Sequence, residues 1–175
     1  MKTAFVCSLL APLAACNPPN EVRGQVDGQS LAVREAIFRK TSAGPIYIHL
    51  TDTTNLCQRL GAADLEFLNT TVLTLTLIGP DEDPQVRAGT YPVASTTRPL
   101  ADGLFIKSDS TGNLVVEPPK GTALGGQVVL DTIDARAGGV AEGSFELNVG
   151  VQSDRVSGNF RAVFCDIDQQ APSLR

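Results

Sequence analysis

The sequence predicts an all-β domain, an antiparallel β-sandwich or partly closed barrel of about 7–9 strands with one short helix near residues 53–61. Apolar and polar side chains alternate through most of residues 22–168, which is the period of a half-buried strand. Short turn signals rich in glycine, asparagine and aspartate separate these alternating segments. Only the segment around residues 53–61 interrupts the alternation.

The first strands are expected between residues 21 and 51. Asp27 and Gly28 lie between two strand-like runs, which predicts a β-hairpin. In PIYIHLT (45–51) the isoleucines and the leucine fall on one face, and the tyrosine, the histidine and the threonine fall on the other. This segment therefore predicts a strand with one buried and one exposed face.

The helix is predicted from the segment that follows. Asp52 or Thr53 is a suitable N-cap, Leu56 and Leu60 are four residues apart, and Gly61 is a suitable stop. These features predict a single short helix.

The remaining strands are predicted from four alternating segments. These are TVLTLTLIG (71–79), a hairpin over 103–118, two strands over 125–150 joined around 135–139, and a last strand over 153–165.

Two of these predicted strands share a glycine two residues before a phenylalanine. The pairs are Gly143 with Phe145 and Gly158 with Phe160, and each pair falls on one face of its strand. A small residue followed by a large one lets a neighbour approach and then fills the core. We interpret the pattern as sheet packing.

The first 20 residues have the features of an export signal. Lys2 is followed by a short apolar run that cannot span a bilayer, which needs about 20 apolar residues. The run ends in Leu13-Ala14-Ala15-Cys16, which resembles the lipobox of bacterial lipoproteins. The resemblance implies that residues 1–15 are a signal peptide, that Cys16 carries acyl chains, and that the protein is anchored to a membrane of the bacterial cell envelope, with the outer membrane or the periplasmic face favoured.

The domain organisation follows from this boundary. Residues 16–21 form a lipidated cysteine and a short tether, in which Pro18 and Pro19 favour an extended chain. Residues 22–168 form a single β domain, and residues 169–175 form a C-terminal tail.

Cys7 falls in the predicted signal peptide and Cys16 is the predicted lipid site. The other two cysteines of the chain are predicted to form a disulfide. Cys57 and Cys165 are an even pair in a chain that we expect to reach an oxidising compartment. The bond is expected to staple the predicted helix over an edge or end of the sheet.

Part of the β domain also resembles small β-sandwich lipoproteins of bacteria. The similarity rests on Gly24 and Gly28, on the segment 88–93 (AGTYPV) and on the terminal Gly-x-Phe strand at 158–160. It implies a fold class and no reaction.

Composition narrows the possible partners. The chain has 14 Lys and Arg against 19 Asp and Glu, a formal charge of −5, and no basic cluster. This balance argues against nucleic acid and against electrostatic docking on anionic lipid. Without tryptophan and with two tyrosines, the chain also lacks the exposed rings that sugar-binding surfaces use.

The sequence contains few candidates for chemistry. Asp81 and Asp83 have the first two offsets of a calcium loop, but the loop lacks its glycine and its final glutamate, so we interpret them as turn residues. We expect no resident metal and no cofactor.

His49 is the sole histidine, and a histidine on the outer face of a strand is expected to be solvated. Tyr47, His49 and Tyr91 are the candidate binding residues, because they are the rarest polar rings.

Three hypotheses about function remain open. The first is a non-catalytic lipoprotein whose domain binds another envelope component, either a partner protein or the matrix. The second is a lipocalin-like carrier of a small apolar ligand inside a closed barrel. The third is a hydrolase that uses His49 or a pair of acids. We favour the first, a protein that is not an enzyme.

Overall fold

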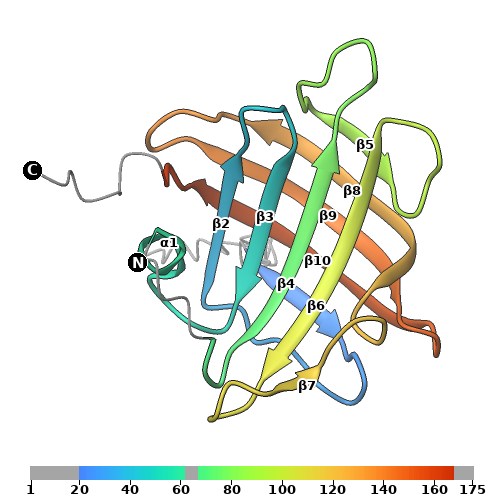
Figure 1. Cartoon of the computed structure of the whole chain (residues 1–175). Coiled ribbons are helices and arrows are strands. Elements are labelled where there is room, and N and C mark those ends of the chain that lie inside the picture. Colours follow the sequence, from blue (N-terminus) through green and yellow to red (C-terminus); the bar gives the residue numbers. More distant parts are fainter. Residues whose placement is uncertain (1–19, 62–66, 168–175) are drawn as a thin grey trace, which may run out of the picture.

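A curled, mixed β-sheet forms most of the structure, a computed structural model that describes residues 20–61 and 67–167 (Figure 1). Its ten strands, in chain order, are β1 (Glu21–Gly24), β2 (Glu35–Lys40), β3 (Ile46–Thr51), β4 (Thr71–Ile78), β5 (Gly89–Pro92), β6 (Leu100–Ser108), β7 (Leu114–Val116), β8 (Ala123–Ile133), β9 (Val140–Val149) and β10 (Asp154–Phe164). One helix, α1 (Leu56–Leu60), follows β3.

The strand order makes the sheet fold back on itself. Neighbours run β5-β8-β9-β10-β2-β3-β4-β6-β7, and β1 pairs with β10 beside the point where β2 joins it. The teal to yellow strands cross in front of the orange and red ones (Figure 1). Single bridges, Val93 with Ala101 and Leu104 with Thr122, connect the two ends of the sheet. The predicted sandwich or partly closed barrel is confirmed.

One pairing departs from the antiparallel expectation. β2 and β10 run parallel, with Ile37 opposite Val163 and Phe38 opposite Phe164. The two strands come from opposite ends of the domain, so no local turn dictates their direction. All other strand pairs in the described residues are antiparallel.

The inner face of the sheet is packed with apolar side chains from nearly every strand. In β4 the leucines are buried and the residues between them are half-buried, as the alternation of TVLTLTLI predicts. The largest fully buried side chains of this cluster are Phe38, Phe105, Phe145, Ile46, Ile48, Leu50, Leu73, Leu75, Leu77 and Leu130. The interior is therefore filled by the protein's own side chains.

The Gly-x-Phe pattern is explained by the register of β9 and β10. Gly143 lies opposite Phe160, and Phe145 lies opposite Gly158. A Cβ atom on Gly143 would lie 2.8 Å from Cζ of Phe160, and one on Gly158 would lie 2.9 Å from Cζ of Phe145. Each glycine thus makes room for the phenylalanine of the neighbouring strand, as predicted.

The predicted hairpin at Asp27-Gly28 is wrong except for its turn. Both residues have positive φ, 49° and 73°, and Val26 and Gln29 exchange two backbone hydrogen bonds across the turn. That bridge is isolated, however. The flanking segments do not pair with each other because β1 lies along β10 and β2 pairs with β3 and β10.

The predicted short helix is present, but its N-terminus is capped differently. The N-cap is Asn55, in a left-handed conformation and without a side-chain hydrogen bond, so neither Asp52 nor Thr53 caps the helix. Instead the Leu56 N–H donates to Oε2 of Glu35, in β2, at 2.9 Å. A carboxylate brought by tertiary structure replaces the local cap.

The predicted disulfide between Cys57 and Cys165 is present, with Cα atoms 5.6 Å apart. Cys165 follows the end of β10 and packs with Ile37 and Leu56 in a second, smaller apolar cluster. Because β10 is flanked by strands on both sides, the bond holds α1 on the outer face of the sheet and not over an edge.

Several expectations fall outside the described residues. The predicted signal peptide, Cys16, Pro18, Pro19 and the tail at 169–175 belong to this group. Among the described residues, no helix combines the length and hydropathy required to cross a bilayer.

Candidate functional site

A small apolar pocket lies on the outer face of the sheet, beside α1. It has a volume of about 170 Å³. Its walls are His49 of β3, Val72 and Thr74 of β4, Ile106 of β6, and Leu56 and Leu60 of α1. The segment before β4 adds Phe67 and Thr70.

The strand registers place these side chains together. His49 lies directly opposite Thr74, and Val72 lies directly opposite Ile106. These residues alternate with the leucines and aromatic residues of the core, so they point outward. α1, held by the disulfide and by Glu35, then shields this part of the outer face from water.

His49 and Thr70 are the buried polar residues of this pocket wall. The His49 side chain is 8% exposed, so the expectation of a solvated histidine is wrong; the reason is the helix cover, which the period of β3 does not reveal. Nδ1 lies 3.0 Å from Oγ1 of Thr74, and Nε2 is buried without a hydrogen-bond partner in the described structure. Burial, with the nearby positive charge of Arg39 as a second cause, lowers the pKa of His49 to about 4. The ring is therefore neutral at neutral pH.

Tyr47, the second predicted binding residue, lies beside His49 on the same face. The two rings are nearly parallel, with centroids 6.4 Å apart. The guanidinium of Arg39, opposite Tyr47 in the β2–β3 register, lies 4.5 Å from the centre of the tyrosine ring. Arg39 was not among the predicted binding residues, although the short turn between β2 and β3 indicates that it lies opposite Tyr47.

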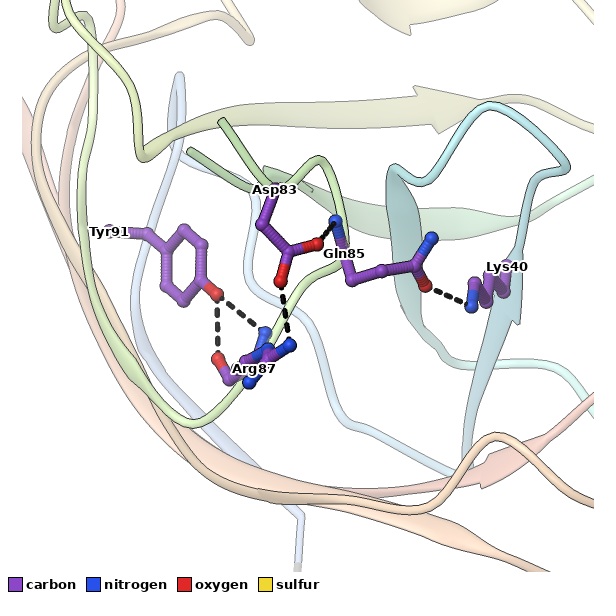
Figure 2. A network of polar contacts seen from close by, with 5 residues as sticks. All are labelled: Lys40, Asp83, Gln85, Arg87 and Tyr91. Carbon is purple, nitrogen blue, oxygen red and sulfur yellow. Dashed lines mark hydrogen bonds and ion pairs between the residues drawn. The ribbon is translucent and has the colours of Figure 1, made fainter. Parts of the chain in front are cut away.

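Tyr91, the third predicted binding residue, lies elsewhere. Its ring is buried in the inner core, and its hydroxyl accepts a hydrogen bond from the Arg87 N–H and donates one to the Arg87 carbonyl, at 3.0 and 2.6 Å (Figure 2). Burial raises the pKa of this hydroxyl. Tyr91 therefore fastens the loop before β5 to the core and does not contribute to the pocket.

The two candidate metal ligands are occupied by arginines. Asp83 pairs with Arg87 at 2.6 Å and accepts the Gln85 N–H at 3.1 Å, while the Gln85 side chain contacts Lys40 (Figure 2). Asp81 pairs with Arg98 at 3.3 Å. Within the described ranges, no group of three or more histidine, cysteine, aspartate or glutamate side chains could hold a metal ion.

The chemistry open to His49 and the size of the ligand are both limited by the geometry of the pocket. The hydroxyl that His49 contacts belongs to a threonine, and an imidazole with a pKa near 4 is a weak base at neutral pH. A pocket of about 170 Å³ is smaller than the roughly 300–1,000 Å³ of sites for drug-sized ligands and cofactors. It can hold one small apolar group. Comparison with family models, with curated proteins and with solved structures gives no match to this chain.

Proposed function

We propose that this chain is a lipid-anchored protein of the bacterial cell envelope whose β domain binds another envelope component and catalyses no reaction. The observation that carries the binding role is the outer-face pocket, which combines apolar walls with three polar lining residues, His49, Thr70 and Thr74. Such a combination of an apolar surface and a few placed polar groups is typical of binding sites.

The anchor is supported by the lipobox at Leu13 to Cys16 and by its position relative to the fold. β1 begins at Glu21, so four residues separate the lipidated cysteine from the first strand. An extended proline-rich chain rises about 3.1 Å per residue, so the five steps from Cys16 to Glu21 give a tether of roughly 15 Å. The domain would therefore act close to its membrane, on a component within that reach.

The alternatives have less support. A lipocalin-like carrier needs an interior space for its ligand, whereas the interior of this sheet is occupied by one continuous apolar cluster. A hydrolase centred on His49 needs a base that is active near neutral pH, and the burial of this ring opposes protonation. Neither alternative gains a specific observation in its favour.

The anchor is tested by Cys16→Ser. We expect this variant to lose labelling by radioactive fatty acid and to leave the membrane fraction. A variant that remains in the membrane fraction without the label would contradict anchoring through Cys16.

The binding role is tested by photo-crosslinking in intact cells. A photoreactive amino acid at Leu60, in the pocket wall, should give one discrete adduct with an envelope component. The same group at Val151, which is 77% exposed in the β9–β10 turn, serves as the matched control and should give none. Equal adducts from both positions, or none from Leu60, would argue against the pocket as the binding surface.

A further inference from the structure

We propose that the Cys57–Cys165 bond is a redox switch: when a dithiol reduces it, α1 leaves the outer face of the sheet, and the apolar side chains beneath the helix, together with His49, become open to solvent. The switch concerns the local structure of the chain, so it operates whether or not the pocket binds a partner. Three features support it: the short helix, the unequal burial of the two cysteines, and the surface that the helix covers.

The helix contributes little to holding its own position. α1 has five residues, whereas an isolated helix needs about 12–15 to be marginally stable in water, and its N-cap, Asn55, makes no side-chain hydrogen bond. Leu56 is buried, while the others are half-buried or exposed. Ordering this segment costs backbone entropy for every residue, and the burial of one leucine offsets only part of that cost. A cross-link to the sheet removes much of the cost, because it restricts the segment before the helix forms.

The bond joins α1 to a fixed point on the sheet. Cys165 directly follows β10, is 2% exposed, and donates its N–H to the carbonyl oxygen of Phe38 in β2 at 2.7 Å. Cys57 lies in the helix and is half-buried. When the bond breaks, Cys165 therefore stays with the sheet, and the helix is the side that is released.

The unequal burial also indicates which sulfur a reductant attacks. A thiolate of the dithiol attacks Sγ of Cys57, the S–S bond breaks, and Sγ of Cys165 leaves as a thiolate that takes up a proton. The second thiolate of the reductant then attacks the reductant sulfur of the mixed disulfide, and Cys57 leaves as a thiolate that takes up the second proton. The protein thus gains two electrons and two protons, and the reductant becomes a disulfide.

The helix covers an apolar part of the outer face. Leu56 and Leu60 form the α1 side of the pocket, and Val72 and Ile106, opposite each other on β4 and β6, belong to the sheet side. His49, in the same pocket wall, is 8% exposed although it points outward from β3. Removal of α1 would leave these strand residues uncovered, so reduction converts a small pocket into an open apolar surface.

His49 reports whether α1 is in place. Burial, with Arg39 of β2 as a second cause, lowers its pKa to about 4 in the disulfide-bonded protein. β2 and α1 also carry Glu35 and Arg59, and the residues that line the pocket from β4 and β6 are uncharged. Loss of the helix removes the cover over the ring, so the pKa should rise toward the value of about 6.5 of a solvated imidazole, held somewhat below it by Arg39.

The experiment compares the oxidised and the reduced forms of the full chain with Cys7→Ser and Cys16→Ser, in which Cys57 and Cys165 are the remaining cysteines. Dithiothreitol serves as the dithiol. The titration midpoint of the ring of the sole histidine, followed by NMR, reports the cover over that ring. The amide signals of α1 and of the central strand β4 separate release of the helix from unfolding of the domain.

We expect reduction to raise the midpoint of His49 by at least about one pH unit. The amide signals of Leu56 and Arg59, whose N–H groups are hydrogen-bonded in the oxidised protein, should move to the positions of an unstructured chain, while the signals of β4 keep their folded dispersion. An unchanged midpoint or unchanged α1 signals would overturn the proposal, because the helix would then hold without the bond. Collapse of the β4 signals would also overturn it, because the whole domain would then unfold.

A variant without the bond is the matched control. Cys57→Ser together with Cys165→Ser should have the midpoint of the reduced chain both with and without dithiothreitol; a midpoint near 4 in this variant would contradict the switch. The comparison of the oxidised and reduced chains leaves both cysteines in place, so it decides the proposal even where this variant fails to fold.

The attacked sulfur is identified with glutathione, a monothiol that forms a mixed disulfide which acid quenching preserves. After a short incubation, peptide mass spectrometry should find the glutathione adduct on Cys57, the half-buried residue of the pair. An adduct predominantly on Cys165 would overturn the proposed order of attack.

Discussion

Acidification should destabilise this protein through one identifiable group, His49. The pKa of this ring is lowered to about 4 in the folded protein, against about 6.5 in an unfolded chain, chiefly because the ring is buried. As the pH falls below about 6.5, the unfolded chain binds a proton that the folded chain does not bind. The free energy of unfolding therefore decreases between pH 6.5 and pH 4, and this loss is absent above pH 6.5.

The magnitude follows from the size of the shift. One pKa unit corresponds to about 1.4 kcal/mol, so a shift from 6.5 to about 4 removes about 3 kcal/mol of stability by pH 4. Total stabilities of small domains are about 5–15 kcal/mol, so this single group would account for a measurable share.

Two assays check this prediction. Because the chain has one histidine, an NMR titration of its ring gives one midpoint, expected near pH 4. Urea denaturation between pH 7 and pH 4, on the wild-type chain and on His49→Phe, isolates the same effect, since the carboxylates titrate in both proteins. The wild-type protein should lose about 3 kcal/mol more than the variant over this range. A midpoint near 6.5, or two parallel stability curves, would refute the burial of this ring.

Three further substitutions test the disulfide, the helix cap and the contact between β1 and β10. Cys57→Ala removes the disulfide and should lower the free energy of unfolding by about 2–5 kcal/mol in urea denaturation, without affecting membrane fractionation; joint loss of both would contradict the separate roles of the cysteines. Glu35→Ala removes the carboxylate that accepts the Leu56 N–H and should cost about 1 kcal/mol, whereas Glu35→Gln, which keeps an oxygen acceptor, should cost less; equal losses would argue against a capping role. Gly158→Ala places a Cβ atom 1.9 Å from the carbonyl oxygen of Glu21, so it should displace β1 and cost about 1–3 kcal/mol in thermal unfolding; an unchanged midpoint would mean that β1 does not lie against β10.

The features that the sequence predicted well depend on local pattern. The strand at residues 71–78 and the hairpin of β8 and β9 follow from alternation and from nearby turn residues. The Cys57–Cys165 pair followed from counting the cysteines left once Cys7 is assigned to the predicted signal peptide and Cys16 to the predicted lipid anchor. The two Gly-x-Phe motifs predicted close packing of the sheet, because the small residue lets a neighbour approach and the large residue fills the core.

The features that the sequence did not predict depend on contacts between distant segments. The parallel pairing of β2 with β10 joins segments that are more than 120 residues apart, and no turn between them indicates a direction. Glu35 caps α1 from strand β2, so the local sequence pattern, which favoured Asp52 or Thr53, did not indicate the cap. The burial of His49 depends on where α1 lies, which the alternation of β3 alone does not show.

The disulfide links the pocket to the export that we propose for this chain. A five-residue helix is far too short to be stable alone, and α1 has no side-chain cap of its own. Its position therefore depends on the Leu56 cluster, on Glu35 and on the bond from Cys57 to Cys165. Such bonds persist in oxidising compartments and are rare in the cytosol. If the chain is exported as we propose, the same step that brings it to its membrane also permits the bond that fixes one wall of the pocket. The binding surface would then be completed only where its partner is found.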